Sequence, residues 1–541
     1  MLKKYTYCLI FLAITLIILL LPYEQYSGDY YPDYRRLLLT FFSILSLFTV
    51  IPKLYKVFLL PFIIIWLFQF LSYFSTGEYV NPLVIENLGH FSDLGKTELF
   101  KFLTISCVVL SLFIILFFTD FSFKGQKYLS AVLLILFSIT LFKKSYPIYN
   151  FYNTCKYVYY VNFGEIESYD GKIFAKNFRA SDLRSVFFNK SNESTKPNII
   201  VFFIEGMSNR VISEKLTPNL FNLQKKSLVF DNYYNHTAAT YRGIRGQLIS
   251  GYQKTGGSYK WQIGVASMNK KQLKRFYDNP NIESLPKILN NNNYDSIFIA
   301  GHGCDANLFS LMEIVGFKKI KGKCDYIGSA SNLSYLSDKE SFELLKHTII
   351  EEKNSKTPFF IAFYNLETHH GMDVKEHVFD NSDNEYYNKF FNLDYYLGNF
   401  IRWLDKENNL ENTLLIVTTD HSTYSVNEFE NSYSYKSVSR SRFVDKIPLI
   451  MYSKNIIPSR IDVEGRNSLA FTPTILDLLG YDNISNHFLG NSLFNNKHSF
   501  WENVSIVNDV FVWTGGRMAH DIFKIDKKHL DELDLYYRFA R

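Results

Sequence analysis

The chain has 541 residues, a length that predicts two or three domains rather than one. Its net charge of +6 forms no basic stripe, and no zinc-finger spacing is present, so the sequence predicts no nucleic-acid partner. Five cysteines exclude a disulfide-stapled scaffold, although Cys304 and Cys324 would be able to pair in an extracytoplasmic domain, leaving Cys155 odd.

Apolar runs fill the chain up to about residue 145. Each is near the ~17–25 residues that a helix needs to cross a bilayer, although the second is short. A signal peptide is the alternative for the first run, but no small-residue cleavage site follows it. The sequence therefore predicts a transmembrane domain with five spans over residues 1–145. The runs are Tyr5–Pro22, Leu37–Ile51, Val57–Phe74, Phe102–Thr119 and Tyr128–Phe142.

Residues 146–196 are expected to form a connector. Tyrosines are frequent in its first part, as is typical of a segment at the lipid headgroups. Its last part, Asn189–Lys196, is polar and predicts a hinge into a separate domain over residues 197–541. Lys and Arg divide evenly between the two sides of the five expected spans, so the positive-inside rule does not orient the chain.

From Pro197 onward, short apolar runs alternate with helical stretches, which predicts an α/β domain with a largely parallel central sheet. Four of these runs end on residues that bind metals or phosphate. Ligands in such sheets bind beyond the carboxyl ends of the strands, so the four ends predict one shared site. The runs and the residues that follow them are Asn198–Ile204 with Glu205, Tyr294–Ala300 with His302, Pro358–Tyr364 with His369 and His370, and Leu414–Thr419 with Asp420 and His421.

The adjacent pair Asp420-His421 supplies one carboxylate oxygen and one imidazole nitrogen. This donor set suits Zn²⁺ or Mn²⁺ better than Mg²⁺. A surface turn with two polar residues is the alternative interpretation of the pair by itself.

A further segment, Asn235–Gly243, contains Thr240-Tyr241-Arg242-Gly243. A threonine hydroxyl becomes a useful nucleophile only when a metal or a base activates it. Bound to a cation held by Glu205, Asp420 and His421, Thr240 would be able to attack phosphorus. Arg242 is spaced to steady the loop or a phosphate oxygen. The alternative is that Thr240 is only an N-cap residue.

The ordered set of motifs resembles the alkaline-phosphatase/sulfatase superfamily. Five spans before such a domain resemble its membrane branch, which contains the lipoteichoic acid synthase-like phosphoglycerol transferases and the lipid A phosphoethanolamine transferases. The motifs are a strand followed by Glu205, then Thr217–Leu220, Thr240-x-Arg242-Gly243 and a late strand followed by Asp420-His421. Asp394–Gly398 and Pro473–Gly480 also resemble family signatures and are expected to be packing elements.

The resemblance implies roles for individual residues. Glu205, Thr240, Asp420 and His421 match the four ligands of one divalent metal ion, and Thr240 matches the nucleophile that becomes a phosphothreonine ester. His302 matches a substrate-binding histidine. Either His369 or His370 matches a histidine that binds the phosphate or protonates the leaving group. The family's catalytic domain lies outside the cytoplasmic membrane, which implies a bacterial multi-pass inner-membrane protein with a periplasmic or other extracytoplasmic catalytic domain.

Two departures refine this interpretation. Gly206 stands where the family usually has serine after the metal-binding glutamate. The sulfatase cysteine with its Cys-x-Pro-x-Arg motif is absent, which counts against sulfate-ester hydrolysis.

The expected function is transfer of a phosphoglycerol or phosphoethanolamine headgroup from a phospholipid donor to a glycan or lipid acceptor. Arg242 and the histidines would stabilise charge or protonate the leaving group. The alternatives are a metal-dependent phosphodiesterase, phosphatase or sulfatase-like hydrolase, and a non-catalytic membrane protein that uses the fold for binding.

Overall fold

A computed structural model of the chain gives two compact units, Met1–Leu88 with Leu94–Gly164, and Gly89–Asp93 with Glu165–Arg541. The residues that it describes are 34–76, 79–80, 96–118, 126–142, 146–163, 168–181, 187, 196–254, 268, 270–303, 306–328, 333–355, 357–372, 374, 376–407, 410–424, 427–433, 443–507, 510–516 and 521–540.

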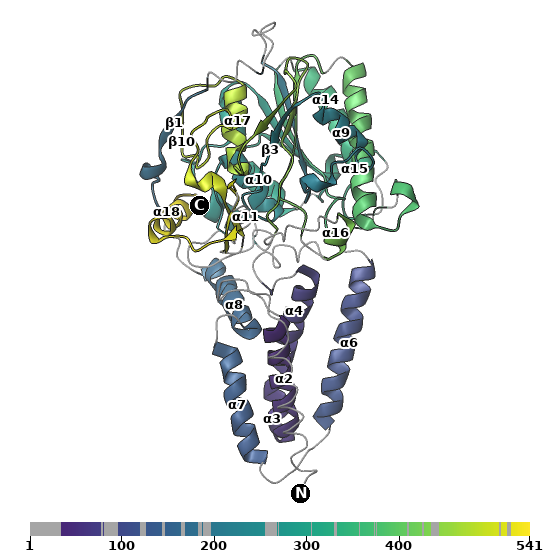
Figure 1. The fold of residues 1–541 in the computed structure, drawn as a ribbon, viewed down its shortest axis with the longest axis vertical. Helices are drawn as coiled ribbons and strands as arrows, with labels where there is room; N and C mark the ends of the chain where they lie inside the picture. Colours follow the sequence, from purple (N-terminus) through teal and green to yellow (C-terminus); the bar gives the residue numbers. More distant parts are fainter. Residues whose placement is uncertain are drawn as a thin grey trace. The chain divides into compact units, whose positions relative to one another are not determined.

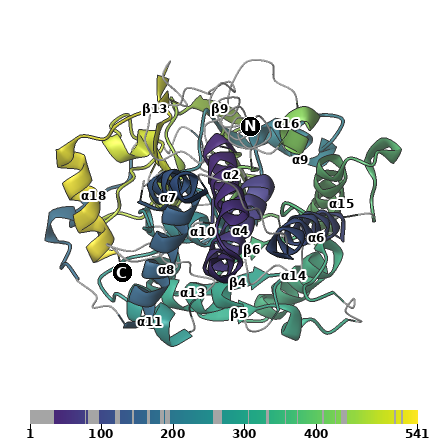
Figure 2. The same cartoon turned by 90° about the horizontal axis from the view of Figure 1, so that it is seen from below.

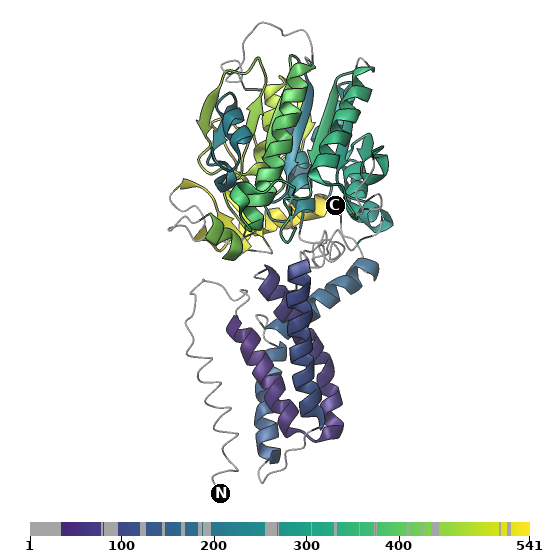
Figure 3. The same ribbon diagram turned by 90° about the vertical axis from the view of Figure 1, so that its right-hand side faces the viewer.

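The N-terminal unit is helical in its described part. Figure 2 looks along its apolar helices, and Figures 1 and 3 show α8 inclined to the others. Their inward faces form one apolar core that includes Phe48, Trp66 and Phe113. The helices are α2 (Tyr34–Val50), α3 (Lys53–Lys56), α4 (Leu60–Thr76), α6 (Lys96–Phe118), α7 (Gln126–Phe142) and α8 (Pro147–Phe163).

One helical stretch in the described residues, Lys53–Tyr73, is long and apolar enough to cross a bilayer, with a mean hydropathy of 2.0. The apolar stretches Ser106–Phe118 and Tyr128–Ile139 are shorter. The first expected span, Tyr5–Pro22, lies outside the described residues. The helix α8 falls in the expected connector and groups with the N-terminal unit.

The C-terminal unit is built on a central sheet, as expected from the alternation of apolar runs and helices. In the described residues the strand order is β5-β4-β6-β2-β7-β8-β3-β9, and β8 alone runs against the others. The α/β class and the largely parallel sheet are therefore confirmed. The strands are β2 (Asn198–Ile204), β3 (Leu228–Asp231), β4 (Asp295–Ala300), β5 (Lys319–Lys321), β6 (Phe359–Tyr364), β7 (Thr413–Thr419), β8 (Ile450–Tyr452) and β9 (Ser459–Asp462).

Helices cover both faces of this sheet (Figure 1). The α-helices described in this unit are α9 (Pro218–Gln224), α10 (Thr240–Ile249), α11 (Lys270–Tyr277), α12 (Leu285–Asn291), α13 (Asn307–Val315), α14 (Asp338–Lys353), α15 (Glu385–Lys406), α16 (Asn427–Ser432), α17 (Phe471–Leu478) and α18 (Lys527–Phe539). Smaller sheets pair β1 (Lys176–Phe178) with β10 (Ile484–Asn486) and join β11 (Val504–Val507), β12 (Val510–Trp513) and β13 (Asp521–Ile522).

Side chains of the central strand β2 alternate between the two helical layers. Phe202 packs against Phe342 of α14 and Phe400 of α15, with ring centroids 6.0 and 5.5 Å away. The next residue, Phe203, packs against Phe471 of α17 at 5.5 Å. Successive residues of a strand point to opposite faces, so a strand buried on both faces is apolar throughout. This explains why the run before Glu205 contains no polar residue after Asn198.

Two expected family signatures meet at the start of α9. The carboxylate of Asp394 accepts the backbone N–H groups of Asn219 and Leu220 at 2.9 and 2.8 Å. Asp394 thus satisfies free N–H groups at the first turn of that helix. The contact agrees with the expectation that the Asp394–Gly398 motif is a packing element.

The cysteines divide between the units. Cys107 and Cys155 are free thiols, and Cys324 is disulfide-bonded. Cys304, the partner considered for Cys324, lies outside the described residues.

Candidate active site

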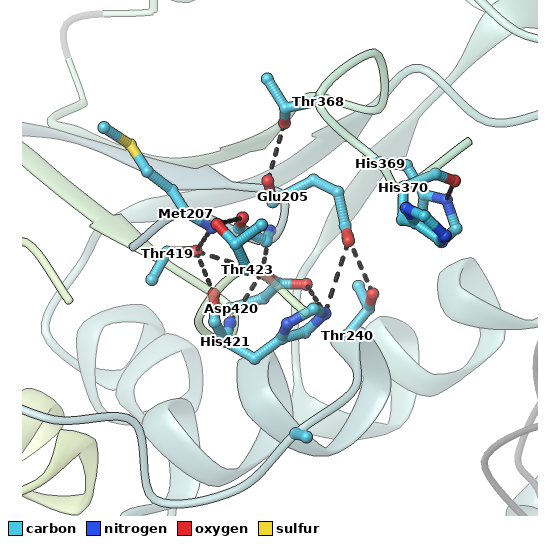
Figure 4. A network of polar contacts seen from close by, with 12 residues as sticks. Glu205, Met207, Thr240, Thr368, His369, His370, Thr419, Asp420, His421 and Thr423 are labelled. Carbon is cyan, nitrogen blue, oxygen red and sulfur yellow. Dashed lines mark hydrogen bonds and ion pairs between the residues drawn. The ribbon is translucent and has the colours of Figure 1, made fainter. Parts of the chain in front are cut away.

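The four polar strand ends expected to share a site belong to neighbouring parallel strands. The order β4-β6-β2-β7 is continuous within the sheet, and the register pairs Ile204 with Thr419 and Ala300 with Tyr364. Residues that follow these strands therefore emerge at one edge. Figure 4 shows Glu205, Thr240, Asp420 and His421 pointing toward one another, with His369 and His370 to one side.

Glu205, Asp420 and His421 form a buried trio with exposed fractions of 1, 0 and 1%. One possible ligand atom from each lies within 4.8 Å of the others. The His421 Nε2 atom is 3.4 Å from Glu205 Oε1 and 3.4 Å from Asp420 Oδ2. Two carboxylates and one imidazole at this spacing are a donor set for a divalent cation.

Hydrogen bonds fix the orientation of the trio and leave its inner atoms open. The Nδ1 atom of His421 lies 2.7 Å from the carbonyl oxygen of Ser422, so Nδ1 carries the proton and Nε2 presents a lone pair. Asp420 Oδ1 accepts the backbone N–H groups of Gly206 and His421 at 2.9 and 2.7 Å. Asp420 Oδ2 and His421 Nε2 have no hydrogen-bond partner. Buried polar atoms are ordinarily paired, so these two fit ligation of a cation.

The electrostatics of the trio lead to the same conclusion. Burial, and then the charge of Glu205, raise the pKa of Asp420 to about 8. Burial lowers the pKa of His421, but the charges of Asp420 and Glu205 outweigh it and raise that pKa to about 9. Burial also raises the pKa of Glu205, yet the positive charge of His421 outweighs it and brings that pKa well below its ordinary value. Two carboxylates this close need a positive charge between them, and a proton or a metal ion can supply it.

Thr240 is the first residue of α10, and its side chain faces the trio. Its Oγ1 atom donates to Glu205 Oε2 at 2.9 Å, and it is partly exposed. The N-cap position belongs to Ala239, and no side chain caps the helix there, so interpreting Thr240 as only an N-cap is wrong. Ala239 has φ 76° and ψ 140°, a conformation that is costly for any residue except glycine. A strained residue thus directly precedes the candidate nucleophile.

Gly243 allows α10 to approach the trio closely. A Cβ at this position would lie 2.1 Å from the backbone oxygen of Asp420. One turn further, Gln247 Nε2 donates to the Thr419 carbonyl at 2.8 Å. The glycine of the Thr-x-Arg-Gly motif is therefore explained by contact between the helix and the strand end, which brings Thr240 next to the trio.

Arg242 is 1% exposed and turns back along its own helix. Its Nε and Nη2 atoms donate to the Ala238 carbonyl at 3.1 and 2.8 Å. Arg242 was expected to steady the loop or to bind a phosphate oxygen. The hydrogen bonds to Ala238 are of the first kind, because they hold the turn before Thr240.

The three candidate histidines have different surroundings. His302 is 5% exposed and stacks on the ring of Tyr364, with centroids 5.6 Å apart. His370 Nδ1 lies 2.7 Å from the hydroxyl of Tyr386 and its ring stacks on that tyrosine. His369 acts electrostatically on Glu205, helping to lower the pKa of that carboxyl.

Two further features near the histidines were missed by sequence reasoning. The fully buried Lys389 donates to the His369 carbonyl at 3.3 Å, and its Nζ lies 3.8 Å from the centre of the Tyr386 ring. Tyr364 donates its hydroxyl proton to Glu205 Oε2 and lies 3.4 Å from Thr240 Oγ1. An aromatic residue at the end of an apolar strand is indistinguishable in sequence from a core residue. The one hint in the sequence is its position, because Tyr364 is the last residue of the apolar run and the polar Asn365 follows it.

The fold and this group of residues define the class of alkaline-phosphatase and sulfatase-like proteins. The Sulfatase family model matches residues 197–481, more than half of the chain, and the chain belongs to the sulfatase family. It is similar to the lipoteichoic acid synthase-like protein YvgJ of Bacillus subtilis (strain 168), with 22% identity over 367 residues. This match covers 63% of the chain and 57% of YvgJ, just over half of that relative's length.

Two solved structures are similar to this chain over about two thirds of its length. An alkaline phosphatase superfamily protein from Vibrio parahaemolyticus matches with a TM-score of 0.51 and 18% identity, over 68% of this chain and 89% of that one. The lipoteichoic acid synthase LtaP from Listeria monocytogenes matches with a TM-score of 0.49 and 15% identity, over 66% of this chain and 96% of that one.

Proposed function

We propose that this protein is a metal-dependent transferase that moves a phospholipid headgroup, with phosphoglycerol favoured, to a hydroxyl of a glycan or lipid acceptor. The observation that supports this most directly is the position of Thr240 Oγ1. Thr240 is a half-buried residue, and its Oγ1 lies 2.9 Å from Glu205 Oε2, beside two buried polar atoms that have no hydrogen-bond partner. The similarity to a lipoteichoic acid synthase-like relative favours phosphoglycerol over phosphoethanolamine.

The reaction has two balanced steps. Thr240 Oγ1 attacks the headgroup phosphorus, the bond from phosphorus to the diacylglycerol oxygen breaks, and the leaving oxygen takes up a proton. An acceptor hydroxyl then attacks the phosphothreonine, the Oγ1–phosphorus bond breaks, and Thr240 regains its proton while the acceptor loses one. A nucleophile of this kind divides one difficult displacement into two easier ones.

Residues of this chain have separate tasks in these steps. Glu205, Asp420 and His421 would hold one divalent cation, Zn²⁺ or Mn²⁺, together with Thr240. When bound, such a cation lowers the pKa of the hydroxyl and stabilises charge on the phosphoryl oxygens. Glu205 Oε2 accepts the Thr240 hydroxyl proton in the structure, which orients Oγ1.

The histidines would act on the phosphate and on the leaving group. One ring nitrogen of each histidine is already engaged, since His369 Nδ1 lies 2.8 Å from the His370 carbonyl and His370 Nδ1 lies 2.7 Å from the Tyr386 hydroxyl. We assign the proton donated to the leaving oxygen to His369, because His369 acts electrostatically on Glu205. His302, buried at the neighbouring strand end, would contact the substrate, and Arg242 would keep the turn before Thr240 in place.

A lipid donor accounts for the apolar N-terminal unit. We propose that residues 1–145 cross the bacterial cytoplasmic membrane five times, that residues 146–196 lie at its surface, and that residues 197–541 form an extracytoplasmic catalytic domain. Cysteine accessibility labelling in intact cells tests this topology. Single cysteines at Lys124 and Lys406 are expected to be protected and labelled, respectively, by an impermeant reagent.

Peptide mass spectrometry of the full chain tests the reaction. After incubation with phosphatidylglycerol and Mn²⁺, a phosphoglycerol mass is expected on the peptide containing Thr240, and addition of acceptor should discharge it. An unmodified Thr240 together with glycerol phosphate released into water would instead identify a hydrolase. Absence of both products would contradict catalysis on this donor.

A further inference from the structure

Glu205 is held at three points by a short segment at the end of β6. The Glu205 backbone N–H donates to Asn365 Oδ1 at 3.0 Å, and its carbonyl accepts the Thr368 hydroxyl at 2.7 Å. Its carboxylate accepts the hydroxyl of Tyr364. Because β6 is parallel to β2 and pairs Tyr364 with Phe203, residues 364–368 run alongside Glu205. One segment thus fixes both the backbone and the side chain of a candidate cation ligand.

The surroundings of Tyr364 direct its hydroxyl toward Glu205. Its ring is 1% exposed and stacks on His302, which fixes the ring plane. An ionised carboxylate only accepts hydrogen bonds, so the hydroxyl proton goes to Glu205 Oε2. Oε2 accepts a second hydrogen bond, from the Thr240 hydroxyl, while Oε1 faces His421 Nε2. The two donors therefore turn Oε1 toward the cation position.

The hydrogen bonds that Tyr364 and Thr240 donate to Glu205 differ in whether they survive the reaction. When Thr240 Oγ1 carries a phosphoryl group, it has no proton left to donate to Oε2. Tyr364 does not react, so its hydrogen bond is present before and after the transfer.

We infer that Tyr364 is a positioning residue that keeps the Glu205 carboxylate oriented for the cation, both before Thr240 reacts and while Thr240 is esterified. The inference rests on the proposed function, because it requires a cation at Glu205 and a covalent state of Thr240. Groups that orient a metal ligand from outside typically change metal affinity or activity by about 10–100-fold when removed. Because Thr240 cannot donate to Glu205 while it is esterified, loss of the Tyr364 hydroxyl should slow discharge of the phosphothreonine more than its formation.

The test compares Tyr364→Phe in the full chain with Tyr294→Phe as a matched control. Tyr294 is also buried beside the sheet, and its hydroxyl donates to the Pro197 carbonyl at 2.9 Å, away from the site. Each metal-stripped protein is titrated with Mn²⁺ and the dissociation constant is measured by electron paramagnetic resonance. Tyr364→Phe is expected to weaken Mn²⁺ binding about 10–100-fold, and Tyr294→Phe is expected to bind as the wild type does.

A second readout follows the covalent state. Tyr364→Phe should show a larger steady-state fraction of modified Thr240, because discharge slows more than formation. Replacing Tyr364 with 4-aminophenylalanine retains both the ring and a donor, and should restore Mn²⁺ binding. Wild-type Mn²⁺ affinity in Tyr364→Phe would overturn the inference, as would weak binding in the 4-aminophenylalanine variant when it is folded.

The Mn²⁺ titration separates this inference from the proposed function, because it needs no turnover. A wild-type protein that binds Mn²⁺ but never carries a Thr240 adduct would contradict the proposed transfer, and the Tyr364 comparison would still be decided by the affinities. A wild-type protein that binds neither Mn²⁺ nor Zn²⁺ would overturn both.

Discussion

The two units of the molecule differ in whether certain buried polar side-chain atoms have hydrogen-bond partners. In the N-terminal unit, Lys56 donates to the Leu116 carbonyl at 2.8 Å and Trp66 donates to the Leu37 carbonyl at 2.8 Å. Gln69 donates to the Pro147 carbonyl and accepts the Val80 N–H, both at 2.7 Å. In the C-terminal unit, Asp420 Oδ2 and His421 Nε2 are equally buried and have no such partner.

The difference shows what each buried polar atom contributes. A paired polar atom in an apolar interior stabilises the fold or costs little, whereas an unpaired one costs about 1–3 kcal/mol. The first group therefore serves packing, whereas the second lowers stability and fits the proposed binding of a cation. Substitutions in the two groups should separate stability from chemistry.

The largest effect is expected from Thr240→Ala. Removing the nucleophile should lower transferase turnover by about 10³-fold or more, and the Thr240 adduct should disappear while the unfolding temperature stays near that of the wild type. Turnover is measured with a labelled phospholipid, and Thr237→Ala is the matched control. Thr237 donates to the Ile506 carbonyl at 2.8 Å, outside the candidate site. Undiminished turnover in Thr240→Ala would contradict the mechanism.

The next effect concerns the cation. Asp420→Asn removes one negative charge from the trio and should weaken Zn²⁺ or Mn²⁺ binding by about 100-fold or more, as measured by metal content after dialysis. Because Asp420 Oδ2 has no hydrogen bond to lose, the metal-free protein should remain folded. Asp231→Asn, on the exposed end of β3, serves as the control and should retain metal.

A smaller change in free energy is expected from Gly243→Ala. Its Cβ would lie 2.1 Å from the Asp420 backbone oxygen, so α10 must shift, and overpacking of this kind costs about 1–3 kcal/mol. Chemical unfolding measures the loss, and Mn²⁺ affinity should fall with it. At Gly303 a Cβ would meet its nearest neighbour at 3.5 Å, so Gly303→Ala should leave the unfolding free energy unchanged. Equal stability of the two variants would contradict the close packing of α10.

In the N-terminal unit, Gln69→Leu should lower stability without changing chemistry. The substitution leaves the Val80 N–H and the Pro147 carbonyl without their partner, at a cost of about 1–3 kcal/mol. Thermal unfolding of the full chain in detergent measures it, with Ser138→Ala on an exposed part of α7 as the control. A change in Mn²⁺ affinity in Gln69→Leu would show that the two groups are not separate.

The smallest expected effect concerns two buried carboxyl groups, those of Asp338 and Glu367. Burial raises the pKa of Asp338 to about 7, and burial together with the Asp338 charge raises that of Glu367 to about 8. Raised carboxyl pKa values contribute stability below the ordinary values near 4, and this is lost as pH rises through about 7–8. Unfolding free energy should therefore fall with pH by about 1 kcal/mol per unit near pH 7. Asp338→Asn should flatten the profile, and an identical slope would contradict the raised pKa of Asp338.

The candidate site residues that lie directly beyond strands could be predicted from the sequence. Glu205, Asp420 and His421 each follow an apolar run, and parallel strands bring such residues to one edge. Tyr364 could not be predicted in this way, because its aromatic ring suits the core and only the third dimension shows its hydroxyl beside Glu205. The sequence also does not show that the two neighbouring histidines have different partners, a carbonyl for His369 and the Tyr386 hydroxyl of α15 for His370. The contact that requires Gly243 depends on how a helix packs against a strand from elsewhere in the chain.

The alternation of Phe202 and Phe203 between the two helical layers has a consequence for insertions and deletions. Glu205 follows β2 without an intervening loop, so its direction is tied to the parity of the strand. Deleting one residue from β2 would exchange the two faces and turn Glu205 away from its partners. Deleting two would restore the faces but withdraw the carboxylate by about 6–7 Å. The length of this strand is therefore itself a functional parameter, and a library of length variants should retain activity only at the native count.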